Sequence, residues 1–282
     1  MDIIKSTAQM QQMVRQWQAD GKRIGLVPTM GALHEGHLSL LDIIRPHCDV
    51  LITSIFVNPA QFGPTEDLNQ YPRDLEGDIA KLSARRSDII FAPDTLQMYP
   101  EGYRTFVTVE NLERKLCGAT RPGHFRGVAT VVAKLFHITK CQVAAFGQKD
   151  YQQSVILKKM VDDLNLDAEI LVAPIIREPD GLAMSSRNAY LTSFEREQAV
   201  VLNQALKMAG YLVSRRTLDV QKIREAMISL IREQPNAVID YVSVVDPDTL
   251  EDVREVSGTV VAAVAVKFGR ARLIDNRILT GG

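Results

Sequence analysis

Cysteine is scarce in this chain. The 282 residues include three cysteines, Cys48, Cys117 and Cys141, and no C-x-x-C pair. An odd number of widely spaced cysteines argues against a disulfide framework, a zinc site or a redox pair. We therefore expect reduced thiols in a cytoplasmic protein.

The sequence also lacks a charge excess and a long apolar run. Lysine and arginine number 33 against 34 acidic residues, so bulk electrostatics offers no reason to expect nucleic acid or a membrane surface as a partner. No segment approaches the roughly 20 apolar residues that a membrane helix needs, and residues 1–5 do not resemble a secretory leader. We expect no membrane partner.

Two common nucleotide-binding fingerprints are missing. Neither G-x-x-x-x-G-K-[ST] nor G-x-G-x-x-G occurs anywhere in the sequence. The missing second fingerprint disfavours a nicotinamide-dependent oxidoreductase.

What is present is a junction at residues 24–44. An apolar run, Ile24–Val27, leads into a turn with two glycines and two histidines, His34 and His37, and an amphipathic segment begins at Leu38. This pattern predicts a strand, a glycine turn and a helix. Backbone N–H groups and the helix dipole at such a junction can hold an anion such as phosphate. A lone histidine is usually structural, but this setting favours a function for both.

Apolar periodicity predicts alternating helices and strands up to residue 176. The expected helices are 6–20, 38–46, 74–86, 128–138 and the segment from about 151; the expected strands are 24–27, 49–57, 88–92, 143–146 and 168–176. Residues 105–109 could form a further strand. Continuous β-branched runs are typical of strands buried on both faces, so we predict a doubly wound, parallel, Rossmann-like α/β sheet.

The pattern changes after residue 176. Helices at 194–214 and 218–233 precede strands at 238–245, 260–268 and 272–279. Helices followed by strands indicate a smaller α+β domain. We predict two domains, residues 1–176 and 177–282.

Polar residues follow several of the predicted strands. Asn58 and Gln61 follow the strand at 49–57. Gly147, Lys149 and Asp150 follow the strand at 143–146. Ligands of open α/β sheets bind beyond the carboxyl ends of the strands. The alternative, that the amides only satisfy turn backbone, is the commoner situation for such a loop.

Two further segments could bind an anion. Arg121 and Arg126 flank glycines before an apolar helix, although a solvated basic loop is about equally plausible. Ser185, Ser186 and Arg187 offer two hydroxyls and a bidentate fork, a weak signal taken alone. His124 stays undecided.

These residues leave three functional hypotheses open. The chain could be an enzyme acting at the α-phosphorus of a nucleoside triphosphate, a nicotinamide-dependent oxidoreductase, or a noncatalytic nucleotide sensor. Pyrophosphate release from ATP in the presence of a carboxylic acid would distinguish the first from the others.

Several motifs together resemble one family. Residues 34–37 match the H-x-G-H signature of the nucleotidylyltransferase superfamily, and residues 184–187 occupy the place of its second loop. The whole chain resembles the pantothenate synthetase family, through segments 28–33, 56–62, 121–127, 149–153 and 272–276.

The resemblance implies an AMP-forming acid–amine ligase. Such an enzyme condenses pantoate with β-alanine, using ATP and Mg²⁺, through a pantoyl adenylate. The alternative is a nucleotidylyltransferase, or an adenylate-forming ligase that acts on another small acid. The family also suggests a homodimer whose second domain closes as a lid.

The resemblance also assigns roles to residues of this chain. It implies catalytic roles for His34, His37, Lys149 and Arg187. It implies substrate contacts for Gln61, Gln153 and Asn58, with Gln61 reaching both pantoate and β-alanine. It implies ATP contacts for Met30, Gly31, His34, His37, Gly147, Lys149, Asp150, Ile176, Met184, Ser185, Ser186 and Arg187.

The chain departs from the family pattern at two positions. Gln148 stands where the family often has Glu, and Gly77 stands beside Asp78 where relatives can carry adjacent acids. A protein ligand for Mg²⁺ is therefore left unassigned, with phosphates and water as the expected ligands.

Overall fold

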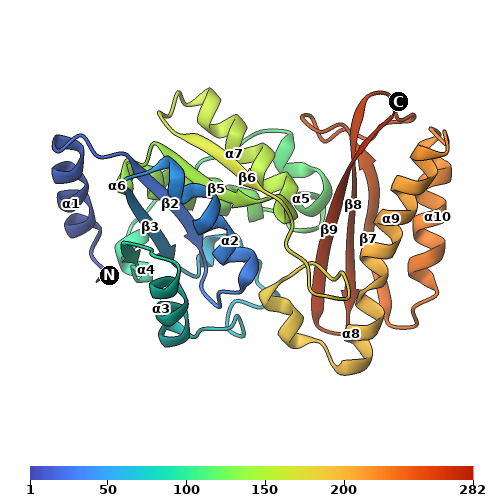
Figure 1. The fold of residues 1–282 in the computed structure, drawn as a ribbon, viewed down its shortest axis with the longest axis horizontal. Coiled ribbons are helices and arrows are strands. Elements are labelled where there is room, and N and C mark those ends of the chain that lie inside the picture. Colours follow the sequence, from blue (N-terminus) through green and yellow to red (C-terminus); the bar gives the residue numbers. More distant parts are fainter. Residues whose placement is uncertain (282) are drawn as a thin grey trace.

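A six-stranded parallel sheet forms the N-terminal half of the structure, a computed structural model that describes residues 1–281 (Figure 1). Its strand order is β1-β4-β3-β2-β5-β6. The strands are β1 (Asp2–Ile4), β2 (Ile24–Thr29), β3 (Val50–Ile55), β4 (Ile89–Phe91), β5 (Val143–Gly147) and β6 (Glu169–Ala173). The order reverses between β2 and β5, the position at which doubly wound sheets bind ligands.

Helices cover both faces of this sheet. Because strand side chains alternate, Leu26 of β2 packs toward α1, α6 and α7, whereas Val27 packs toward α2 and α3. The helices of this half are α1 (Thr7–Ala19), α2 (Glu35–Ile44), α3 (Leu75–Ala84), α4 (Thr95–Met98), α5 (Leu116–Thr120), α6 (His124–Thr139) and α7 (Tyr151–Asp163).

The C-terminal half is a three-stranded antiparallel sheet with helices on its outer face (Figure 1). Its elements are α8 (Ser193–Ala199), α9 (Val201–Ser214), α10 (Val220–Arg232), β7 (Ala237–Val245), β8 (Thr259–Phe268) and β9 (Ala271–Thr280). One face forms a separate core with α9 and α10. The other meets the N-terminal half, where Tyr241 and Ile274 pack against its core.

The predicted fold class is confirmed, and the local differences include the following. Residues 105–109 belong to neither sheet, β1 was not predicted, and the helix expected over 194–214 is interrupted at Val200. Three residues are enough for β1 because it pairs with β4, a contact that local periodicity does not reveal.

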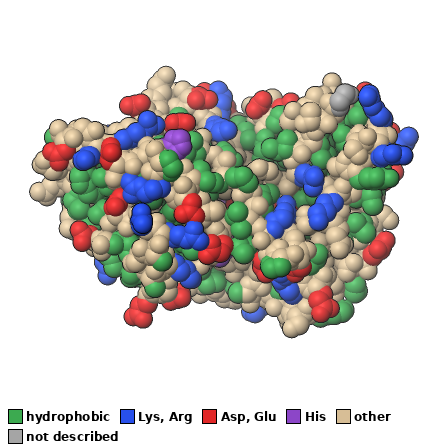
Figure 2. Space-filling view, in the orientation of Figure 1, with side chains coloured by type: hydrophobic (Ala, Val, Ile, Leu, Met, Phe, Trp, Pro, Cys, Tyr) green, Lys and Arg blue, Asp and Glu red, His purple; other side chains and the backbone are tan. Residues whose placement is uncertain are grey.

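The surface agrees with the balanced composition. Figure 2 shows acidic and basic side chains interspersed over the visible face, without a large patch of one sign. In the part of the chain that the structure describes, every helix is too short or too polar to cross a bilayer.

Candidate functional site

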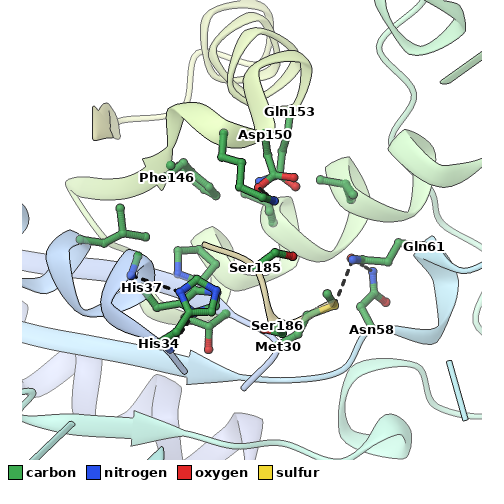
Figure 3. A pocket seen from close by; sticks show the side chains of 18 of the residues that line it. Met30, His34, His37, Asn58, Gln61, Phe146, Asp150, Gln153, Ser185 and Ser186 are labelled. Atoms are coloured by element: carbon green, nitrogen blue, oxygen red, sulfur yellow. Dashed lines mark hydrogen bonds and ion pairs between the residues drawn. The ribbon is translucent and has the colours of Figure 1, made fainter. Parts of the chain in front are cut away.

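One cavity of about 210 Å³ lies beyond the carboxyl ends of β2, β3, β5 and β6. Every residue for which the sequence predicted a binding or catalytic role lines this cavity, except Gly31. Figure 3 shows the two histidines on one side, Met30, Asn58 and Gln61 on another, and Asp150 and Gln153 opposite. Segments far apart in the sequence thus meet at the switch point of the sheet.

Gly31 shapes the turn behind the cavity wall instead of lining it. Its φ is +80°, and a Cβ there would lie 2.9 Å from Oδ2 of Asp78. Only glycine adopts this backbone conformation without strain.

Asp78 of α3 holds the same turn. Its carboxylate is 1% exposed and accepts hydrogen bonds from the N–H groups of Ala32 (2.8 Å) and Leu33 (2.7 Å). Lys81 donates to the carbonyl of Leu33 at 2.8 Å. Both carboxylate oxygens of Asp78 are therefore engaged by the backbone of the turn.

His34 and His37 are fastened to the start of α2. Nδ1 of His34 accepts a hydrogen bond from the N–H of Gly36 at 3.1 Å, and Nδ1 of His37 accepts from the N–H of His34 at 3.4 Å. Since each Nδ1 is an acceptor, the ring proton of each neutral histidine resides on Nε2. A Cβ at residue 36 would lie 2.9 Å from the His34 ring, which explains the glycine.

Both histidines are neutral over the physiological range. Burial, reinforced by the charge of Lys149, lowers the pKa of His34 to about 4. Burial and the neighbouring His34 lower the pKa of His37 well below its usual value. The pair can therefore present two neutral N–H donors to an anion.

Asn58 holds Gln61 in place. The Asn58 amide donates to Oε1 of Gln61 and to the carbonyl of Gly127, each at 3.1 Å, and its oxygen accepts from Tyr99 at 2.8 Å. Gln61 in turn donates to the sulfur of Met30 at 3.1 Å. Because the Asn58 amide is 1% exposed and already bonded on both ends, this geometry fits a positioning role better than direct substrate contact.

His124 also contacts Gln61, through a hydrogen bond to its backbone. Its Nδ1 donates to the Gln61 carbonyl at 2.8 Å, and its Nε2 accepts from Arg121 at 2.9 Å. Arg121 forms a bidentate pair with Glu66, with both distances 2.7 Å. Burial and the Arg121 charge lower the pKa of His124 to about 4, so this ring too is neutral. Arg121 and His124, undecided from sequence, both line the cavity.

Lys149 and Asp150 form the corner between β5 and α7. The Lys149 ammonium lies 3.6 Å from the Asp150 carboxylate. Asn276 of β9 donates to the carbonyls of Gln148 (2.9 Å) and Lys149 (3.0 Å), and the Gln148 side chain donates back to Asn276 at 3.2 Å. The second sheet thus fixes the backbone that carries Lys149.

Gln152 and Gln153 have opposite environments. Gln152 is buried, accepts from the N–H of Cys117 and donates to the carbonyls of Leu112 and Lys115. Gln153 faces the cavity, and its amide has no hydrogen-bond partner among residues 1–281. The amide of Gln153 is therefore available to a ligand.

The loop of residues 184–187 closes one side of the cavity. Met184 donates to the carbonyl of Ile176 at 3.0 Å, and Ser186 donates to that of Ala32 at 3.2 Å. The guanidinium of Arg187 donates two hydrogen bonds of 2.9 Å to the carboxylate of Asp67. These contacts place both serine side chains in the lining.

Sequence reasoning missed the apolar wall of the cavity. Its lining residues come from β5, the inward face of α6 and the residue that follows β3, and include Phe56, Val128, Val131, Val132, Leu135 and Phe146. Their periodicity is that of ordinary core residues, so no local signal distinguishes them. A charged rim beside an apolar wall suits a small molecule with anionic and alkyl parts.

Comparison with known proteins identifies the family of this chain. The family model for pantoate-beta-alanine ligase matches residues 2–278. A pantothenate synthetase of Acetivibrio thermocellus is 53% identical over 279 residues, covering 99% of each chain, and one of Geobacter sulfurreducens is 51% identical with the same coverage.

Solved structures of the same kind have the same fold. Pantothenate synthetase from Thermus thermophilus superposes with a TM-score of 0.94 at 42% identity, covering 98% of this chain and 99% of the other. Pantoate-beta-alanine ligase from Francisella tularensis, complexed with beta-gamma ATP and beta-alanine, gives 0.81 at 34% identity, covering 99% and 97%. The chain belongs to the pantoate-beta-alanine ligase family, a family of ligase enzymes.

Proposed function

We propose that this protein condenses pantoate with β-alanine to give pantothenate, converting ATP to AMP and pyrophosphate. The observation that carries the proposal is the cavity itself. Two neutral histidine donors, a lysine, two serines, the Gln153 amide and an apolar wall all line this one cavity. The histidines, the lysine and the serines form one group of ligands, and the amide and the apolar wall form another. ATP phosphates suit the first group, and the hydroxyl, carboxylate and methyl groups of pantoate suit the second.

The first half-reaction needs alignment and charge neutralisation. A pantoate carboxylate oxygen bonds to the α-phosphorus of ATP, and the bond from that phosphorus to the bridging oxygen breaks, releasing pyrophosphate. In this proposal Nε2–H of His34 and His37 and the ammonium of Lys149 stabilise charge that develops on phosphate oxygens. Asp150 accepts hydrogen bonds from the ribose hydroxyls.

The second half-reaction uses the same cavity. The β-alanine amine bonds to the acyl carbon of the adenylate, AMP leaves with the electron pair of the broken C–O bond, and the amine loses a proton. Gln61 and Gln153 position the acyl group through neutral amides. In the first half-reaction the same amides hold pantoate without a salt bridge to its carboxylate, which is therefore free to attack. No covalent enzyme intermediate is required.

Mg²⁺ belongs to this proposal as the counter-ion of ATP. Asp150 is the one carboxylate among the lining residues, and among residues 1–281 no group of three or more His, Cys, Asp or Glu side chains is arranged to hold a metal. Asp78, adjacent to Gly77, is occupied by the turn. Mg²⁺ accepts phosphate and water as most of its ligands, so this lining fits an ion that arrives with the nucleotide and is held chiefly by it.

We further propose a cytoplasmic homodimer in which residues 177–282 act as a lid. Contacts of Ser186 and Arg187 with the N-terminal half support this role, because they lie at the mouth of the cavity. Closure would protect the acyl adenylate from water.

A two-stage assay tests the proposed reaction. The protein is incubated with ATP, Mg²⁺ and pantoate, and β-alanine is added later. We expect pyrophosphate in the first stage and pantothenate with AMP in the second. Pyrophosphate release with another small acid but not with pantoate would instead identify a different adenylate-forming ligase.

A further inference from the structure

The hydroxyl of Ser54, on β3, is buried without a hydrogen-bond partner among residues 1–281. The residue is 0% exposed. Buried polar atoms are nearly always bonded in native proteins, because an unpaired atom loses its hydration without compensation. Of the buried side-chain atoms that lack a partner in the described part of the chain, Oγ of Ser54 is the one whose residue lines the cavity. A ligand in the cavity is therefore a natural partner for it.

Ser54 lies within the apolar wall of the cavity. Side chains of a strand alternate between the two faces of the sheet, so Ser54 points to the same face as Ile52 and Phe56. Both belong to the core that includes Val128 and Phe146. Phe56, Val128 and Phe146 line the cavity together with Ser54. The hydroxyl is thus an isolated polar group on an apolar surface.

Neighbouring polar groups are already engaged. Thr29, at the end of β2, donates its hydroxyl to the Ser54 carbonyl at 2.7 Å and accepts from the N–H of Gly31 at 3.2 Å. The amide of Asn58 is bonded at both ends. These contacts hold the chain around Ser54 and leave its hydroxyl to a group that enters the cavity.

The surroundings define the chemistry of that group. A serine hydroxyl is neutral, and it can both donate and accept a hydrogen bond. An ion beside an apolar wall would lose its hydration at high cost, so a neutral partner is favoured. A hydroxyl carried on a branched alkyl group fits, since the alkyl part covers the wall and the hydroxyl pairs with Ser54.

We propose that Ser54 recognises the terminal hydroxyl of pantoate, an inference that rests on the function proposed above. The carbon that bears this hydroxyl is attached to the quaternary carbon that bears both methyl groups. Methyl groups placed against the apolar wall therefore bring the terminal hydroxyl to the wall as well. The other hydroxyl is adjacent to the carboxylate, so it stays with the reacting group among the charged and amide side chains.

An analogue without the terminal hydroxyl tests this contact. In 2-hydroxy-3,3-dimethylbutanoate a methyl group replaces the hydroxymethyl group of pantoate. The measurements are kcat/KM for pyrophosphate release and the dissociation constant of each acid by calorimetric titration. Ser54→Ala should lower kcat/KM for pantoate and raise its dissociation constant by about threefold to tenfold, the effect of one neutral hydrogen bond. Neither quantity should worsen for the analogue, which has no hydroxyl to pair with Ser54.

The adjacent residue provides a matched control. Thr53 points to the opposite face of the sheet, is 0% exposed, and has its hydroxyl 2.9 Å from that of Ser87. Thr53→Val should therefore lower the urea midpoint of unfolding and leave the preference for pantoate over the analogue unchanged. Ser54→Ala should leave the midpoint unchanged or raise it, because it removes an unpaired buried hydroxyl.

Three results would overturn the inference. Equal losses with pantoate and the analogue would show that Ser54 only shapes the cavity, and no loss with pantoate would show that the hydroxyl does not bind it. A urea midpoint for Ser54→Ala as low as that for Thr53→Val would show that the hydroxyl is paired inside the folded protein. In all three cases, pantothenate synthesis by the wild type would leave the proposed function intact. A wild-type protein that releases no pyrophosphate with pantoate would overturn the proposed function, and this inference with it.

Discussion

The guanidinium of Arg187 donates two hydrogen bonds of 2.9 Å to the carboxylate of Asp67. This pair joins the loop of the C-terminal half to the segment that follows Gln61. The Arg187 partner holds the pKa of the Asp67 carboxyl below its usual value, although burial opposes this. The arginine that the family resemblance assigns to ATP is thus the ion-pair partner of Asp67.

The first prediction concerns this pair. If Arg187 must leave Asp67 to reach the triphosphate, Asp67→Asn should lower the dissociation constant for ATP, by roughly threefold to tenfold, because the competing state is weakened. Arg187→Ala should raise it. Calorimetric titration with a non-hydrolysable ATP analogue measures both. Weaker ATP binding by Asp67→Asn would show instead that Asp67 positions Arg187 for its ligand.

The second prediction concerns His37. Replacing it with alanine should lower the rate of pyrophosphate release by about 100-fold to 1000-fold, the usual effect of removing one preorganised donor. Lys149→Ala should act in the same direction. The matched control is exposed His47→Ala, which should leave the rate unchanged. Stopped-flow detection of pyrophosphate measures the rate, and a near-normal value for either site variant would remove that residue from the mechanism.

The third prediction compares adjacent glutamines. Gln153→Ala should raise the dissociation constant for pantoate and change ATP binding little, because its amide has no protein partner among residues 1–281. Gln152→Ala should instead lower the free energy of unfolding by about 1–3 kcal/mol, since it leaves buried backbone groups unpaired. Pantoate titration and urea unfolding separate the two effects. Unchanged pantoate affinity in Gln153→Ala would contradict its proposed role.

The fourth prediction concerns pH and follows from His34. Its pKa is about 4 in the folded chain and near 6.5 when unfolded, so between these values the unfolded state binds more protons. The free energy of unfolding should therefore fall as pH decreases from 6.5 to about 4. Urea unfolding across this range should show a shallower fall for His34→Gln than for the wild type or for His47→Gln. Equal pH slopes would indicate that burial does not depress this pKa.

Local sequence predicted much of the site because its parts lie at strand ends. The glycine turn before α2 and the corner at Lys149 were each recognisable from neighbouring residues. They also had to meet, since β2 and β5 are adjacent parallel strands whose carboxyl ends share one edge. Asn58 shows where that reasoning stops. It was assigned to substrate, but its amide is bonded to Gln61, Gly127 and Tyr99, and two of these lie more than 40 residues away.

The sequence alone determined the order of most strands and helices, the change to an α+β pattern after residue 176, and the residues that could bind a phosphate. Tertiary structure decided which atoms are free to act. It engages both oxygens of Asp78 with a turn 45 residues away, and it directs Nε2–H of two histidines as donors. The physical reason is that periodicity records only which face of an element is buried. Hydrogen-bond partners, desolvation and the resulting protonation states arise from contacts between distant segments, which exist only in the folded chain.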